Sequence, residues 1–327
     1  SLSLALSLLP TAAFAEGEVT ETPGEEMLPE VTTGETVATV NGTAAYTSLA
    51  DAVQNATSGD TIQLQENTDI SGTGLTIPAD KSLTLDLNGK EIKAANNGSF
   101  VVLGSLTVSD TSARTGRIYS ETQYGSGYTS GIILVNGENA LLTLTGGSIE
   151  SAFENAAANG QFGVAVWDGG DFTMTGGKIE AGWYAISGNG NNSTQNSVIN
   201  ISGGELISTA DFAVYLPQSG TTNITGGTIY GEAGGISIQR GTLNISDEAL
   251  ITSKGTGDTG DWGDGTGGQD AAAVNIAAEY GDCTVNISGG KLTAEENALF
   301  IKADSKCDID FSITGGTFSS DVSDYVA

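Results

Sequence analysis

A ten-residue motif centred on a double glycine returns along this chain and constrains its fold more than any other feature. A clear copy is LTLTGGSIES, from Leu142 to Ser151. The copies start at intervals of roughly 21 to 42 residues, the irregular period of a solenoid whose coils carry loops of different lengths. With degenerate copies included, the copies of the motif start at Leu83, Leu106, Leu142, Phe172, Ile199, Thr222, Leu243, Val285 and Phe311.

Apolar and polar residues alternate within each copy, which predicts strands with one buried face. The glycine pair supplies the positive φ of a sharp corner between two strands. The second strand then buries one apolar residue per copy, and stacking the copies forms an aliphatic ladder. The predicted ladder is Ile92, Ile118, Ile149, Ile179, Leu206, Ile229, Leu250, Leu292 and Phe318.

A third short strand precedes most copies, as in GIILV from Gly131 and GVAVW from Gly163. Three strands per coil, each parallel to its counterpart in the next coil, predict an all-β fold. This fold is a right-handed parallel β-helix of about nine coils over residues 61–320. A leucine-rich repeat is excluded because no coil shows a helical period, and a sandwich because the repeat lacks hairpin turns.

Residues 36–60 predict an N-terminal cap that contains a short helix. Ser48 and Asp51 form a capping-box pattern, and Gly59 is predicted to end the helix. The open end of a coil stack exposes an unpaired strand edge, so the helix is expected to act as a lid. Its apolar face consists of Leu49, Ala52, Val53 and Ala56.

The order of this helix, the segment GDTIQL from Gly59 and the coils resembles the opening of pectate-lyase-like right-handed β-helix proteins. The closing ITGGTFSSDVSDYVA from Ile313 is similar to the end of such modules in surface proteins of Gram-positive, gut-type bacteria. The resemblance covers residues 36–327. It implies an exported module joined to further domains of the same chain, with residues 321–327 starting a C-terminal extension.

The first residues, SLSLALSLLPTAAFAE, predict the back half of a secretory signal peptide over residues 1–15, with an A-x-A cleavage site after Ala15. A membrane anchor would need about 20 apolar residues, and this run is shorter. Residues 16–35 are acidic and poor in large apolar side chains, which predicts a disordered linker. The expected localisation is therefore secreted or at the cell surface.

The charge and the missing histidine exclude several functions. The 327 residues include 40 acidic and 11 basic side chains and no histidine, for a formal charge of −29. Such a charge disfavours binding to nucleic acid and to anionic membranes. Without histidine, the serine and cysteine triads and most zinc sites are also excluded.

The enzymes that the resemblance suggests do not match the sequence. Pectate-lyase-like enzymes combine aspartate-bound calcium with an arginine or lysine base, and polygalacturonase-like hydrolases need a histidine. Arg114 and Arg117 are predicted to pair with Asp110 in their own loop rather than to lie beside an acidic cluster. Asp168 and Asp171 are explained by turn geometry, with a glycosidase pair as the alternative. No catalytic residue is therefore assigned.

An acidic insertion, KGTGDTGDWGDGTGGQD from Lys254, offers carboxylates on a glycine-rich loop. Calcium takes six to eight oxygen ligands and suits such a loop, although the spacing is not that of an EF-hand. A solvated acidic loop is the alternative. Calcium here is the one cofactor considered, with Asp258, Asp261, Asp264 and Asp270 as its candidate ligands.

Outward-facing aromatic side chains are the candidates for contact with a glycan or with a host or cell-surface protein. Strand alternation turns Trp167, Tyr215 and Phe300 outward, and Trp262 lies in the acidic insertion. The alternative is that these are scattered surface aromatics. Long loops over residues 119–130, 151–163 and 253–272 are expected to wall a groove, adding Tyr124 and Tyr128.

An outward polar column is also predicted, and its role is explained by cross-strand hydrogen bonding. A flat threonine array can bind ice, but the change from threonine to asparagine halfway argues against that function. The column is Thr84, Thr107, Thr143, Thr173, Asn200, Asn223, Asn244, Asn286 and Ser312.

Cys283 and Cys307 precede the same strand in adjacent coils. Their predicted register is two residues out of line, which puts the α-carbons about 8 Å apart, slightly beyond disulfide reach. A disulfide and two buried thiols are both left open.

These observations favour a non-catalytic, adhesin-like surface module that displays loops for glycan or host-surface contact. The alternative is a polysaccharide-active enzyme, a glycosidase or lyase, that works through carboxylates on the same fold.

Overall fold

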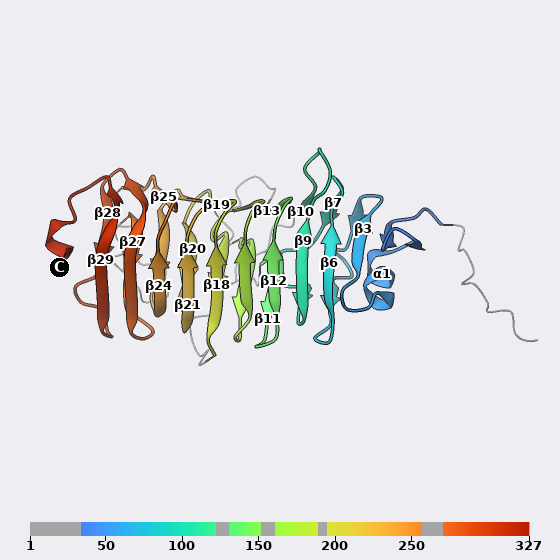
Figure 1. Cartoon of the computed structure of the whole chain (residues 1–327), viewed down its shortest axis with the longest axis horizontal. Helices are drawn as coiled ribbons and strands as arrows, with labels where there is room; N and C mark the ends of the chain where they lie inside the picture. Colours follow the sequence, from blue (N-terminus) through green and yellow to red (C-terminus); the bar gives the residue numbers. More distant parts are fainter. Residues whose placement is uncertain (1–33, 122–130, 152–160, 189–194, 257–270, 327) are drawn as a thin grey trace, which may run out of the picture. The chain divides into compact units, whose positions relative to one another are not determined.

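The computed structural model describes residues 34–121, 131–151, 161–188, 195–256 and 271–326. Within these residues the chain winds as a right-handed parallel β-helix, as predicted, with each coil contributing one strand to each of three rows. Figure 1 shows the strands of successive coils side by side from β3 to β29. The signal peptide, nearly all of the acidic linker, Tyr124, Tyr128, Trp262 and the four candidate calcium ligands lie outside the described residues.

The first row of strands carries the start of each repeat. Its members are β3 (Thr61–Leu64), β6 (Ser82–Asp86), β9 (Ser105–Ser109), β12 (Leu141–Leu144), β15 (Asp171–Met174), β18 (Ser197–Ile201), β21 (Gly220–Ile224), β24 (Gly241–Ile245) and the first halves of β27 (Cys283–Ala294) and β29 (Ile309–Phe318).

The second row follows the double-glycine corner and belongs to the same sheet. Its members are β4 (Thr68–Asp69), β7 (Glu91–Lys93), β10 (Arg117–Ser120), β13 (Ser148–Ser151), β16 (Lys178–Ala181), β19 (Glu205–Ser208), β22 (Thr228–Gly231), β25 (Leu250–Ser253) and the second halves of β27 and β29.

The third row forms a separate sheet of parallel strands. It consists of β5 (Leu75–Ile77), β8 (Phe100–Val102), β11 (Ile133–Asn136), β14 (Val164–Trp167), β17 (Ile186–Gly188), β20 (Phe212–Leu216), β23 (Gly234–Ile238), β26 (Ala272–Ile276) and β28 (Asn297–Ile301). The described residues therefore form nine coils with a strand in every row, and β29 begins a tenth.

The double glycine has two different functions at the corner. At Gly203 a side-chain Cβ would lie 2.5 Å from the carbonyl oxygen of Thr175 in the preceding coil, so the first glycine allows the coils to approach. At Gly204 the backbone has a φ of +85°, which favours glycine. In the last two coils, β27 and β29 run through this corner without a break.

The aliphatic ladder is present with one correction. The registers align Ile92, Ile118, Ile149, Ile179, Leu206, Ile229, Ile251, Leu292 and Phe318. Leu250 was the predicted member in β25, but it is 44% exposed and Ile251 is buried in its place. The cause is the degenerate corner, where residues 246–249 connect two strands that residues 225–227 connect in the preceding coil. One extra residue moves the side chains of a strand to opposite faces.

The outward polar column is aligned in full by the strand registers. Its asparagines form a chain of amide hydrogen bonds in which Asn223 donates to Asn200 over 2.9 Å and Asn244 donates to Asn223 over 2.8 Å. Asn286 donates to Asn244 over 2.9 Å. Asparagine thus links successive coils through side chains as well as through the backbone, which explains its use in this half of the column.

The N-terminal cap consists of β1 (Ala38–Val40), β2 (Ala44–Tyr46) and α1 (Leu49–Asn55). Ser48 caps α1, since its Oγ accepts from the backbone N–H of Asp51. The helix ends at Asn55, four residues before Gly59, which is a correction to its predicted end. Strand β1 pairs antiparallel with β3 and covers the free edge of the first coil, a contact that was not predicted.

At the other end, the 3-10 helix η2 (Ser323–Tyr325) follows β29, and the Tyr325 ring packs edge-on against Phe311 at 5.8 Å. Among the described residues, no helix has the length and apolar character needed to cross a membrane.

Candidate functional site

The three predicted aromatic residues within the described chain point outward, but they do not form one surface. Trp167, Tyr215 and Phe300 are half-buried, while their strand neighbours Val166 and Val214 are fully buried. The registers place Tyr215 and Phe300 at the same position in strands three coils apart, which is about 14 Å. Trp167 lies at a different strand position.

Tyr215 instead belongs to a cluster that the sequence analysis missed. The aromatic cluster comprises Phe162, Trp183, Tyr184 and Tyr215, from three consecutive coils. Tyr184 is its centre, because its ring stacks on Tyr215 at 4.7 Å between centroids and lies 5.1 Å from Phe162 and 6.2 Å from Trp183. Phe162 is buried, whereas the other three rings are half-exposed.

The geometry of the cluster follows from the register. Val164 pairs with Ile186, so Phe162 and Tyr184, each two residues earlier, meet at the entry to the third row. The backbone keeps this alignment, because the N–H of Trp183 donates to the carbonyl of Gln161 over 2.9 Å. The signal in the sequence was an aromatic residue just before the third-row strand in adjacent coils.

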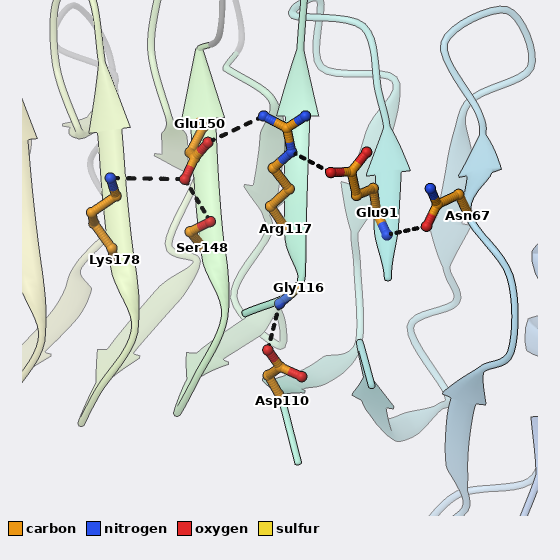
Figure 2. Close-up of polar contacts among 8 residues, drawn as sticks. All are labelled: Asn67, Glu91, Asp110, Gly116, Arg117, Ser148, Glu150 and Lys178. Carbon is orange, nitrogen blue, oxygen red and sulfur yellow. Dashed lines mark hydrogen bonds and ion pairs between the residues drawn. The ribbon is translucent and has the colours of Figure 1, made fainter. Parts of the chain in front are cut away.

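A second arrangement of chemical interest is a charge ladder on the outer face of the second row. We define it as Glu91, Arg117, Glu150, Lys178 and Glu180, contributed by β7, β10, β13 and β16. Arg117 Nε donates to Glu91 Oε1 over 3.0 Å, and its Nη1 lies 3.5 Å from Glu150 Oε2. Figure 2 shows Glu150 lying between Arg117 and Lys178.

The charge ladder corrects the prediction that Arg114 and Arg117 pair with Asp110. Asp110 accepts backbone N–H groups, from Gly89 over 2.9 Å and from Gly116 over 2.5 Å, and so shapes its own loop. Arg117 follows Gly116 directly and is the first residue of β10, where it faces the glutamates of the neighbouring strands. An arginine beside an acidic cluster is therefore present.

The electrostatics of the charge ladder keep both of its cations protonated. Burial lowers the pKa of Arg117, but the hydrogen bond to Glu91 and the charges of Glu91 and Glu150 outweigh it and raise the pKa. The Arg117 guanidinium also lies 4.1 Å from the Tyr119 ring centre. The hydrogen bond to Glu180 likewise raises the pKa of Lys178. Neither cation is thus suited to act as a base.

The charge ladder is expected to stabilise the stacking of coils. Replacing Arg117 by methionine should lower the free energy of unfolding by about 1 kcal/mol, because the network is half-exposed and Glu91 and Glu150 lose their shared cation. The difference should shrink in high salt. Urea denaturation at low and high salt measures it, with the exposed Arg114→Met as control. Equal loss in both variants would contradict this role.

Other candidate residues have structural roles in the described chain. Asp171 accepts from the backbone N–H of Val198 in the next coil over 2.7 Å, and Asp168 occupies a turn with a φ of +52°. The conformation of Asp168 agrees with turn geometry, whereas Asp171, the first residue of β15, links its coil to the next. Among the described residues, no three His, Cys, Asp or Glu side chains are arranged to hold a metal ion.

The cysteines have the predicted register, since Cys283 pairs with Ile309, two residues after Cys307. The two thiols are not bonded to each other. Burial, with a smaller contribution from Cys307, raises the pKa of the Cys283 thiol to about 12. Its thiolate is therefore scarce at neutral pH, which disfavours a nucleophilic role.

Comparison with known proteins assigns no family to the chain. The chain matches no protein-family model, no curated protein and no solved structure.

Proposed function

We propose that this chain is a non-catalytic, extracellular β-helix module that binds glycans at a cell surface through its aromatic cluster. The observation that carries the proposal is the stacked pair of Tyr184 and Tyr215, flanked by Trp183, on two consecutive coils. Sugar rings have apolar faces that pack on aromatic rings, while their hydroxyls remain hydrated. Tyr215 is held by strand β20, and Tyr184 packs against Phe162, Trp183 and Tyr215 at the corner before β17. Half-buried rings held in this way suit that contact, because little ordering entropy is lost on binding.

The setting of the module is part of the same proposal. The apolar leader over residues 1–15 supports export, and the lid helix followed by coils supports kinship with pectate-lyase-like modules of Gram-positive surface proteins. In this proposal the module presents its loops and surface as an adhesin. A host or cell-surface glycan is accordingly the proposed partner. Nucleic acid and anionic membranes are not proposed as partners, because the charge of −29 disfavours binding to both.

A glycan array with the purified protein, followed by calorimetry on a bound glycan, tests the proposal. Tyr184→Ala removes the central ring and should weaken binding at least about tenfold. Phe300→Ala is the matched control, because it removes an aromatic ring of the same intermediate burial from β28, outside the cluster. Thermal melts check that both variants fold. Equal weakening by the two variants, or no bound glycan, would refute the aromatic cluster as the site.

A polysaccharide lyase is the second candidate, and the charge ladder is the observation that favours it. Arg117 lies between Glu91 and Glu150 on neighbouring strands, with cation and carboxylates on one sheet face. The raised pKa of Arg117 argues against proton abstraction by this residue. Incubation with acidic polysaccharides, followed by absorbance of unsaturated products, distinguishes the two functions. Product formed by the wild type and lost in Arg117→Met would support the lyase.

A further inference from the structure

A polar pocket of about 430 Å³ lies at the corner where the third row passes into the first row. Its volume is in the range of sites that bind small molecules. Every residue that lines it is described, and none belongs to the aromatic cluster or to the charge ladder. The lining residues are Asn196, Ser197, Val198, Ser219, Gly220, Thr221, Arg240, Gly241, Thr242 and Asp282.

The register of four consecutive coils builds this pocket. Ser197 pairs with Gly220, and Gly241 pairs with Cys283, so the preceding residues Asn196, Ser219, Arg240 and Asp282 form one polar column along the rim. Thr221 pairs with Thr242 on the opposite side. The pocket is therefore walled by side chains that can donate and accept hydrogen bonds.

Two glycines let the coils pack closely beside the pocket. A Cβ at Gly220 would lie 2.0 Å from the carbonyl oxygen of Ser197 in the preceding coil, and Gly220 has a φ of +128°. Gly241 follows it in the next coil with a φ of +87°. Glycine is therefore required here by the close approach of the coils and by the positive φ.

The hydroxyls that can reach the pocket belong to residues on the outer face of the strands. Thr221 and Thr242 are half-buried and alternate with the buried Thr222 and Leu243. Ser197 lies on the core-facing side of β18 with Ile199, so its hydroxyl points away from the pocket.

From this geometry we infer that the pocket binds one neutral sugar unit through its hydroxyls. Arg240 donates, Asp282 accepts, and the serine and threonine hydroxyls do both, as the vicinal hydroxyls of a sugar require. Arg240 and Asp282 carry opposite charges, so the rim is balanced. The formal charge of −29 disfavours an acidic ligand. The inference rests on the proposed glycan function and names a second contact for it.

The two contacts are close enough to serve one glycan. Tyr215 of the aromatic cluster and Ser219 of the pocket are four residues apart in the same coil, a separation of at most about 14 Å. A glycan of a few units that stacks on the cluster can therefore place a further unit in the pocket.

Saturation-transfer NMR with millimolar methyl glucoside, methyl galactoside, methyl mannoside and methyl glucuronoside tests the pocket directly. Wild-type protein should saturate one of the neutral hexosides. Thr221→Val should weaken that binding by about fivefold, the effect of one hydrogen bond. Thr242→Val should act likewise. Thr173→Val is the matched control, because Thr173 is also a half-buried, outward-facing threonine but lies in β15, outside the pocket.

The outcomes separate this inference from the proposed function. Loss of hexoside binding in Thr221→Val and Thr242→Val, with Thr173→Val and Tyr184→Ala unaffected, supports the pocket whatever the array shows. No hexoside signal, equal signals in all variants, or preference for the glucuronoside would overturn the inference. If the pocket inference fails but binding on the glycan array depends on Tyr184, the aromatic cluster remains supported as the glycan site.

Discussion

Replacing Glu279 by glutamine is expected to lower the free energy of unfolding by about 3 kcal/mol, because it removes one partner from a buried ion pair. The Glu279 side chain is only 1% exposed, and it pairs with Lys302 and Lys306. The Lys302 side chain is 12% exposed, so its ammonium cannot recover full hydration when the carboxylate is lost.

The position of this ion pair explains why its effect extends beyond one side chain. Glu279 lies between β26 and β27, and the two lysines lie between β28 and β29. The ion pair therefore connects two successive corners between the third row and the first row, beside the backbone bond from Cys307 N–H to the Ala278 carbonyl. Its loss should loosen β28 and β29 first.

The same residue should contribute to acid sensitivity. Burial raises the pKa of Glu279, but the hydrogen bonds and charges of Lys302 and Lys306 outweigh it and hold the pKa below the usual 4.5. A lowered pKa in the folded state means that the stabilisation is complete above pH 4.5 and is lost as the pH falls through the folded-state pKa. Asp60, Asp69 and Asp86 also have lowered pKa values, so the whole protein should weaken in acid.

Urea midpoints measured from neutral pH into acid distinguish the contribution of Glu279 from that background. The difference between wild type and Glu279→Gln should be largest at neutral pH and should shrink in acid. Glu66→Gln is the control, because Glu66 is 49% exposed and 3.9 Å from its partner Lys90, and it should change little. A difference that stays constant with pH would show that the carboxylate is not the cause.

Much of the fold was predictable because strand alternation and the double glycine repeat in every coil. The buried ladder and the polar column depend only on alternation and on a constant corner length, and they were correct wherever that length was kept. Leu250 shows the limit, since one extra residue at a degenerate corner moved Ile251 into the core. Pairing of β1 with β3 was missed because three-residue strands carry almost no periodic signal.

The candidate sites were less predictable, because they depend on contacts between coils. The partners of Arg117 are decided by the register of β7, β10 and β13, whose connecting loops differ in length, so a neighbour in sequence such as Asp110 seemed the closer partner. Tyr184 lies at a corner, where alternation no longer tells which way a side chain points. The polar pocket depends on the register of four coils, which brings together residues as distant in sequence as Asn196 and Asp282.

Replacing Lys81 by methionine is expected to release the N-terminal cap from the first coils. Lys81 Nζ donates to three carbonyl oxygens at the end of α1, those of Val53 and Gln54 over 2.7 Å and that of Ala56 over 2.8 Å. These carbonyls have no partner further along the helix, and a cation near a helix C-terminus also interacts favourably with its dipole. The methionine keeps the apolar stem and removes only the ammonium.

Hydrogen exchange is the measurement that isolates this effect. Amides of α1 and of β1 should lose about 3 kcal/mol of protection in Lys81→Met, the size expected when charged hydrogen bonds are removed, while β12 and β15 in the middle of the stack keep theirs. Lys90→Met is the control, since Lys90 forms only a 3.9 Å pair with the exposed Glu66. Unchanged protection in α1 would show that burial of Leu49, Ala52 and Val53 holds the cap without Lys81.

Release of the cap has a consequence for assembly that follows from the topology. Strand β1 covers the edge of β3, and α1 packs beside it, so opening the cap leaves the first-row edge of the stack without its antiparallel partner. An uncovered edge can pair with another chain. Lys81→Met should therefore form concentration-dependent oligomers on mild heating, whereas Lys90→Met should behave like the wild type. Light scattering detects the oligomers. Monomeric Lys81→Met with a demonstrably open α1 would mean that β1 alone is enough to protect the edge.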